Sequence, residues 1–407
     1  MREPGRASDP HGGHDLSADA TAARQEASKA QGRAAQATDA RADARADARA
    51  DARADARADA RADARADARA DKKRPRWRRR TVFTWALSAV GGAILLILAS
   101  RRLEVIPSSL DLARPDLFLW AIALQLPYAA IRALRLRYAL DPLARAASHG
   151  ALRRLPARVL YGSGWLSFAV IMLLPLRLGE LSRPLLLRQS QIPGIGLSES
   201  ISAVATERVV DGLMVVGLLF GGLTLATPTA GAAAIAEVRG VGQMMAALFG
   251  LGLVAVIAVA KAPDAAISGL RLGPRPAELI RHVAAAIRPL GRPAQGIPFI
   301  LWSLVYWALT TAQLWLVLRA CGLGLGAAEA AAIVAAIGLS IQLPGGPAQA
   351  GSFQVGALAG LSLFLDSAAS RELISSFIAL MYLLSLGGTL LLALPGLWLL
   401  RQSDPPA

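Results

Sequence analysis

The sequence LPLRLGELSR, from Leu174 to Arg183, places two arginines and a glutamate inside an otherwise apolar part of the chain. A second charged run, TERVVD, covers Thr206–Asp211. Both runs touch apolar segments long enough to enter a bilayer, where an ionisable side chain costs a few kcal/mol or more. We therefore interpret the two runs as either a functional site or an obligatory set of internal ion pairs.

The composition around these runs is that of a membrane protein. Hydrophobic residues make up 54% of the 407 positions and charged residues only 18%. A helix needs ~20 apolar residues to cross a bilayer, and the apolar runs predict an all-α polytopic bundle with about six full spans. The expected spans are Thr81–Ser100, Leu117–Leu134, Ala205–Thr227, Val241–Ala260, Ile297–Leu318 and Leu373–Leu400.

The net charge of +15 is unevenly distributed. Residues 1–71 hold 13 basic and 14 acidic side chains, so the whole positive excess lies in the remainder, between the apolar runs. Basic loops on the cytoplasmic side of a membrane account for such an excess. We therefore expect no nucleic-acid partner.

The N-terminal region is predicted to lie outside the membrane. Residues 39–71 repeat Arg-Ala-Asp-Ala, which puts like charges four apart and disfavours a helix. We expect residues 1–71 to form a disordered low-complexity tail, with a self-associating ionic strand array as the alternative. No apolar core with a cleavage site occurs in the first 70 residues, so we expect no signal peptide. A basic juxtamembrane segment (72–80), an integral membrane domain (81–401) and a short polar tail (402–407) complete the predicted organisation.

The chain lacks the usual ligands for metals and cofactors. Cys321 is its single cysteine, and its four histidines are scattered. Neither a metal site nor a disulfide framework is expected from that pattern. No Gly-rich phosphate-binding motif is present, so we expect no nucleotide cofactor.

Two further apolar regions, Val159–Leu176 and Ala330–Leu365, are interrupted, the second by the turn-forming sequence LPGGPAQAG from residue 343 to 351. The arginine-rich loops 135–158 and 261–292 are expected in the cytoplasm. The first interrupted region must then enter and leave on the cytoplasmic side, and the second on the outer side. This pattern predicts two re-entrant hairpins in an inverted repeat, a plan in which broken helices line a transport site. The alternative is two ordinary crossings.

The charged runs resemble those of the lysylphosphatidylglycerol synthase transmembrane family, which includes the flippase domain of the multiple-peptide-resistance factor. The resemblance covers roughly residues 81–401 and rests on LPLRLGE with Arg183, ERVVD at 207–211, RALRLRY at 132–138, and LPGGP with GSFQ at 343–354. It implies a domain that moves a polar-headed lipid between leaflets. Gln354 stands where the family pattern has a glutamate. Because the chain ends at Ala407, we expect no aminoacyl-transferase domain and no lysine transfer.

The predicted site follows from spacing and chemistry. On a helix Arg177, Glu180 and Arg183 share one broad face, and a guanidinium matches a phosphate better than an ammonium does. We expect Arg208 to pair with Asp211, and Glu207 to orient Arg177 or Arg183. The candidate lipid headgroup-binding residues are Arg177, Glu180, Arg183, Glu207, Arg208 and Asp211. The candidate broken-helix turn comprises Pro344, Gly345, Gly346 and Gly351. The alternative is that these charges are ion pairs at the cytoplasmic edge.

The sequence therefore favours a flippase-like transporter of a phosphate-bearing lipid, with membrane lipids as its partners. Two alternatives remain: a membrane enzyme acting on phospholipid or polyprenyl-phosphate substrates, and an accessory subunit of an envelope-synthesis enzyme. Composition indicates a bacterial inner membrane, and the charge pattern places both termini in the cytoplasm.

Overall fold

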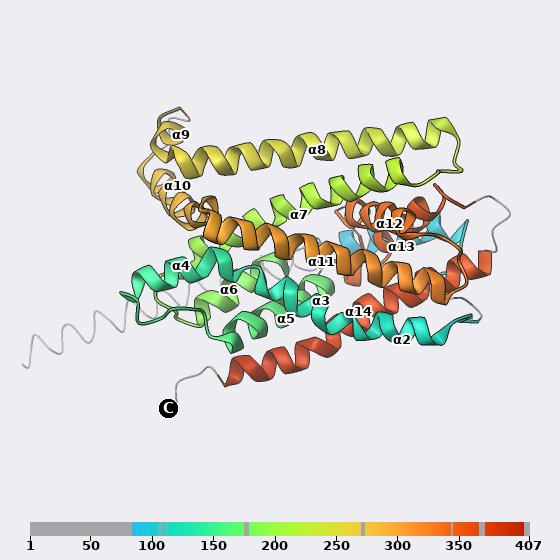
Figure 1. Cartoon of the computed structure of the whole chain (residues 1–407), viewed down its shortest axis with the longest axis horizontal. Helices are drawn as coiled ribbons and strands as arrows, with labels where there is room; N and C mark the ends of the chain where they lie inside the picture. The colour runs from blue at the N-terminus through green and yellow to red at the C-terminus, as the bar shows by residue number, and fades with distance from the viewer. Residues whose placement is uncertain are drawn as a thin grey trace, which may run out of the picture. The chain divides into compact units, whose positions relative to one another are not determined.

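Helices alone form the regular structure of the part of the chain that the computed structural model describes (Figure 1). The predicted all-α polytopic bundle is confirmed. The predicted tail 1–71, the basic segment 72–80 and residues 403–407 lie outside the described residues, as do Arg177 and Pro344. The structure describes residues 84–105, 107, 109–110, 112–174, 179–269, 273–342, 345–365 and 371–402.

Five helical segments of the described residues are long and apolar enough to cross a membrane. They are Pro115–Leu134, made of α2 (Pro115–Ala123) and α3 (Gln125–Leu134), α7 (Leu197–Leu225), α8 (Ala232–Lys261), α11 (Pro293–Ala320) and α14 (Arg371–Arg401). The remaining predicted span, Thr81–Ser100, corresponds to a shorter apolar helix, Thr84–Ser100.

Several helices begin before their apolar run. The span predicted from Ala205 starts at Leu197, because the backbone N–H of Gly196 donates to the Glu199 carboxylate at 3.0 Å and caps the helix there. A capping contact of this kind satisfies a backbone donor that the first turn leaves unpaired. Hydropathy marks only the part of a helix that faces lipid or core, so it misses such polar first turns.

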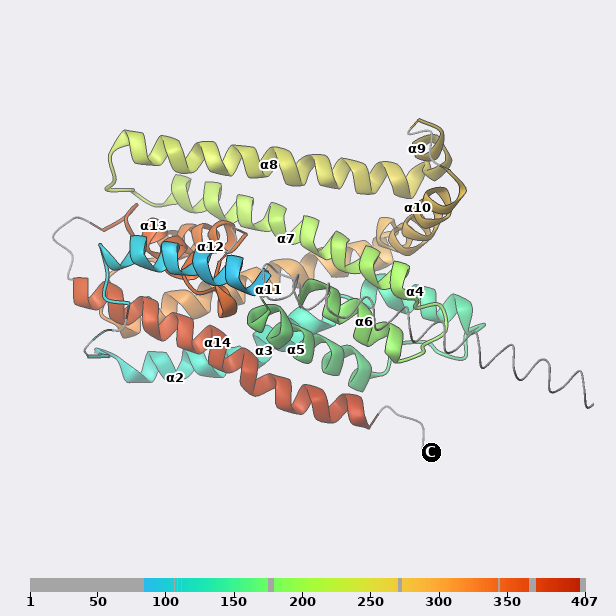
Figure 2. The same ribbon diagram turned by 180° about the vertical axis from the view of Figure 1, so that it is seen from behind.

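The two interrupted regions form hairpins of short helices. The first consists of α5 (Ala157–Leu173) and α6 (Ser182–Gln189), and the second of α12 (Ala327–Ser340) and α13 (Ser352–Leu361). In Figures 1 and 2, α5 and α6 lie toward the end that carries α4 (Arg137–Ala147), α10 (Pro274–Ile287) and the C-terminal end of α14, whereas α12 and α13 lie toward the opposite end. The predicted pair of broken hairpins, one from each end, is therefore present.

In both turns, described residues give the chain specific support. In the first turn, a side chain at Gly179 would collide with the backbone of Ile171, so only glycine allows the chain to fold back on α5. In the second turn, Gly351 has a φ of 85° and its N–H donates to the Gln354 side-chain oxygen at 2.8 Å. Backbone polar groups at membrane depth need such internal partners.

The second turn is also held by helices from elsewhere in the chain. Ser88, in the helix Thr84–Ser100, donates to the carbonyl of Gly345 at 2.7 Å. The Tyr382 hydroxyl, on α14, donates to the carbonyl of Ala348 at 2.8 Å. The first helix (blue in Figure 2) and α14 therefore fix the turn from two sides.

The outer surface of the bundle is apolar. Along α8 none of the most apolar 18-residue window is buried, and exposed leucines such as Leu251 are 70% accessible. The buried apolar residues instead form two cores, one around α12 and α13 and one around α4 and the first hairpin. An apolar exterior on this scale suits lipid rather than water.

Candidate functional site

A fully buried arginine lies at the centre of the charged residues. Arg135, at the end of α3, is 0% exposed. Its guanidinium donates to Asp211 at 2.6 Å, to Glu207 at 2.7 Å and to the Ser303 hydroxyl at 3.1 Å. It also lies over the ring of Tyr306, 4.4 Å from the centroid. A buried charge persists only with partners of this number and quality.

Glu207 bridges two arginines from different elements. One of its oxygens accepts from Arg135, and the other lies 3.1 Å from Nη1 of Arg183 on α6. The second Nη of Arg183 donates to the carbonyl of Ala133 at 2.8 Å. The expected contact between Glu207 and Arg183 is therefore present, and it joins the first hairpin to α7 and α3.

Asp211 has the expected partner, Arg208, and a closer one that was not expected, Arg135. Arg208 Nη1 is 3.9 Å from Asp211, whereas Arg208 Nε donates to Glu180 at 3.0 Å. Asp211 is held by Arg135 and by Trp307, whose indole N–H donates at 3.1 Å. The expected Arg208–Asp211 pair is thus confirmed as a longer contact, and Arg135, 76 positions earlier in the chain, is the closer partner of Asp211.

Arg132, one turn before Arg135, has a different environment. Its guanidinium lies 3.8 Å from the centroid of the Phe168 ring. No ion pair or hydrogen bond joins its side chain to another described residue. Within the described part of the cluster, four guanidiniums face three carboxylates, so one positive charge remains, and Arg132 is the arginine without an acidic partner.

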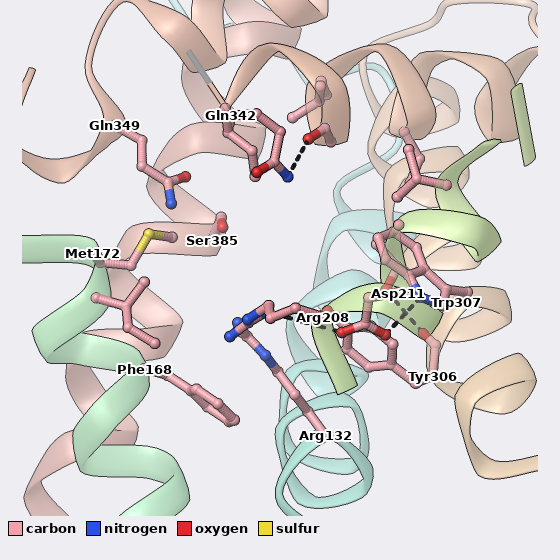
Figure 3. Close-up of a pocket in the computed structure, with 18 of the residues that line it drawn as sticks. Arg132, Phe168, Met172, Arg208, Asp211, Tyr306, Trp307, Gln342, Gln349 and Ser385 are labelled. Carbon is pink, nitrogen blue, oxygen red and sulfur yellow. Dashed lines mark hydrogen bonds and ion pairs between the residues drawn. The ribbon is translucent and has the colours of Figure 1, made fainter. Parts of the chain in front are cut away.

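These charges border a cavity of about 440 Å³ (Figure 3). Arg132, Glu180, Arg208 and Asp211 line it, whereas Arg135, Arg183 and Glu207 lie behind its wall. Both hairpins contribute: Glu180 follows the first turn and Gln349 belongs to the second. The rest of the lining is mainly apolar, including Ile171, Met172, Leu314, Val334 and Phe353. The cavity is thus a polar site in an apolar surround, between the tips of the two hairpins.

The predicted turn residues support the second hairpin rather than line this cavity. Gly345, Gly346 and Gly351 shape the turn, and Gln354 caps α13 through its amide oxygen. Because an amide oxygen accepts this bond as a carboxylate oxygen would, the replacement of glutamate at position 354 leaves the capping role intact.

Sequence reasoning missed Arg132 and Arg135 as site residues. Both end an apolar span, where arginines are usually read as cytoplasmic anchors. Their i, i+3 spacing was the available signal, because it turns both toward one side of α3. Among the described residues, no group of three or more His, Cys, Asp or Glu is placed to hold a metal ion.

The fold and the site define a polytopic helical membrane protein with two broken hairpins and a positively charged internal cavity. The chain belongs to the lysylphosphatidylglycerol synthase TM region family, whose model matches residues 83–393. The resemblance drawn from the charged runs is confirmed. Comparisons with curated proteins and with solved structures gave no match.

Proposed function

We propose that this protein is a flippase-like transporter that moves a phosphate-bearing lipid between the two leaflets of a membrane. The observation that supports this most is the position of Arg132. It is the cluster's guanidinium without an acidic partner among the described residues, and it lines the cavity at which both hairpins meet.

A phosphate suits this position chemically. A guanidinium presents parallel N–H donors to two phosphate oxygens. Arg208, although bonded to Glu180, lines the same cavity and adds a second cation (Figure 3). The cavity volume of about 440 Å³ falls within the usual range for small-ligand sites. The headgroup would occupy it while the acyl chains stay in the bilayer.

The hairpins supply a route to each leaflet. The first approaches the cavity from the end with α4 and α10, and the second from the opposite end (Figure 1). Movement of one hairpin against the other would expose the site alternately to the two sides. The arginine-rich loops at the end with α4 support a cytoplasmic location for that end and for the C-terminus, in a bacterial inner membrane.

Lipid flux in vesicles tests the proposal. Purified protein is reconstituted with phosphatidylglycerol carrying a fluorescent acyl chain, and outer-leaflet fluorescence is quenched with a membrane-impermeant reductant. We expect Arg132→Ala to slow flux at least about tenfold, because a charge-assisted hydrogen bond contributes ~1.5–3 kcal/mol. Arg132→Lys should retain part of the rate, since it keeps the charge.

Arg281→Ala is the matched control, because Arg281 is an exposed arginine whose partner, Asp264, lies away from the cavity. It should leave flux unchanged. Flux in the Arg132→Ala protein equal to that of the unaltered protein, at equal reconstitution, would contradict a role for Arg132 in lipid transport.

A further inference from the structure

The described residues on the wall of the cavity that faces the arginines are polar but uncharged. Gln349, in the second turn, and Ser385, on α14, line it, together with Gln342, which follows α12 and donates to the carbonyl of Gly338 at 3.2 Å. Figure 3 shows these three residues across the open centre of the cavity from Arg132 and Arg208. Among the described residues, this wall therefore carries amide and hydroxyl groups and no charged side chain.

Both carboxylates that line the cavity are already bonded to other groups. Glu180 accepts from Arg208 at 3.0 Å, and Asp211 accepts from Arg135 and Trp307. Glu207 lies behind the wall, between Arg135 and Arg183. An ammonium group entering the cavity would have to share one of these carboxylates with the arginine that already neutralises it.

The charge balance also opposes a cation. Counted over the described residues, the cluster holds one more guanidinium than carboxylates, and the surplus charge faces the cavity on Arg132. Like charges a few ångströms apart in a partly solvated protein site repel each other strongly. The same surplus attracts a phosphate.

Amides and hydroxyls suit a headgroup rich in hydroxyls. Each glutamine side chain carries two N–H donors and a carbonyl acceptor, so it can both donate to and accept from an alcohol. Gln349 is the best placed of the set, because it belongs to the turn at the tip of the second hairpin and points into the cavity (Figure 3).

We infer that the cavity selects an anionic lipid whose phosphodiester carries an uncharged hydroxyl-bearing group, such as glycerol or a sugar, and disfavours a lipid whose headgroup carries ammonium groups. The phosphate lies on Arg132, and the hydroxyls lie against Gln349 and Ser385. This inference rests on the proposed lipid transport and specifies its substrate class.

A comparison of two lipids that differ in headgroup charge tests the inference. Phosphatidylglycerol is the first, and its lysyl ester, which adds two ammonium groups to the same phosphodiester, is the second. Binding is measured as the shift in melting temperature of the full-length protein in detergent with short-chain forms of each lipid. Flux is measured in vesicles with fluorescent forms. The unaltered protein should bind and move phosphatidylglycerol about tenfold better than the ester.

Gln349→Glu is the diagnostic variant, because it adds a carboxylate of nearly the same shape to the uncharged wall. It should reduce the preference by on the order of tenfold, mainly by improving recognition of the ester. Gln191→Glu is the matched control: Gln191 is exposed, lies outside the cavity, and has a φ of 49° against 59° for Gln349, so both changes meet the same backbone conformation. The control should keep the original preference.

The outcomes separate the two proposals. Equal or stronger binding and flux of the lysyl ester in the unaltered protein overturns the selectivity, as does a preference that Gln349→Glu leaves unchanged, while lipid transport stands. If neither lipid is bound or moved, the proposed function fails and the selectivity fails with it. A preference for phosphatidylglycerol that Gln349→Glu weakens and Gln191→Glu preserves supports both.

Discussion

Arg135 and Asp211 form an ion pair of 2.6 Å between the end of α3 and the middle of α7, with the arginine side chain fully excluded from solvent. The same guanidinium bonds Glu207, which in turn holds Arg183 of the first hairpin. The Arg135 side chain therefore connects α3 to α7 and, through Glu207, to the first hairpin. Removal of Arg135 leaves buried carboxylates without their cation. An unpaired buried charge destabilises a protein more than replacement of the whole ion pair by apolar residues does.

Arg135→Met should destabilise the protein by ~3–5 kcal/mol, the usual cost of breaking a buried ion pair on one side. Thermal unfolding in detergent measures this as a large fall in melting temperature. Adding Asp211→Asn to the same protein should restore part of the loss, because it removes the carboxylate that Arg135 held most closely while Glu207 keeps Arg183 as its partner. A melting temperature for Arg135→Met within error of the parent would show that the network contributes little.

Glu180→Gln should tighten binding of phosphate-bearing lipid. Glu180 is the carboxylate that accepts from Nε of Arg208, and both line the cavity. Neutralising it raises the local positive charge by one, and we expect a gain in phosphatidylglycerol affinity of a few-fold, strongest at low salt because the pair is partly exposed. Titration calorimetry at two ionic strengths tests this, and unchanged or weaker binding would count against phosphate recognition by Arg208.

Gln354→Ala should cost ~1 kcal/mol of stability, whereas Gln354→Glu should keep most of it. The Gln354 amide oxygen accepts from the Gly351 N–H at 2.8 Å at the start of α13, and loss of such a cap has about that effect. A glutamate can make the same contact. Equal melting temperatures for the Gln354→Ala variant and the unaltered protein would show that the cap is not needed for the second turn.

Cys321 should resist thiol reagents in the folded protein. It follows the last residue of α11 and is 1% exposed, and burial raises the pKa of its thiol to about 12. At pH 8 the thiolate fraction is then on the order of 10⁻⁴, and the thiolate is the reactive form. We expect maleimide mass labelling only after denaturation. Rapid labelling at pH 8 without denaturant would contradict this burial.

The spans and both hairpins could be predicted because hydropathy and arginine distribution record directly how a helix meets lipid and water. The charged residues of α7 and α6 could be predicted as well, since carboxylates and arginines beside apolar helices require partners. The full set of ion pairs among these residues could not be predicted. Local spacing predicted the Arg208–Asp211 pair, which is present at 3.9 Å, but not the closer bond that Arg135 makes to Asp211 from another helix.

Other parts of the site depend on three-dimensional placement alone. In the sequence, Arg132 and Arg135 resemble arginines that anchor a helix at the membrane edge. Only the folded bundle shows that Arg135 is buried and that Arg132 lines the cavity. Gln349 enters the cavity only because the second turn reverses the chain after α12, with Ala348 and Gln349 at φ values of 58° and 59°. No periodicity in the sequence records such a reversal.

Because each hairpin stops partway and both tips border one cavity, the proposed transport path would cross a thinner insulating layer than a continuous helix spans. The membrane voltage would fall across this shortened distance, at the place where the proposed headgroup resides. A headgroup with one negative charge that traverses the full potential experiences about 2.3 kcal/mol per 100 mV. With the cytoplasm negative, that electrical work favours net movement of an anionic lipid toward the outer leaflet without nucleotide hydrolysis.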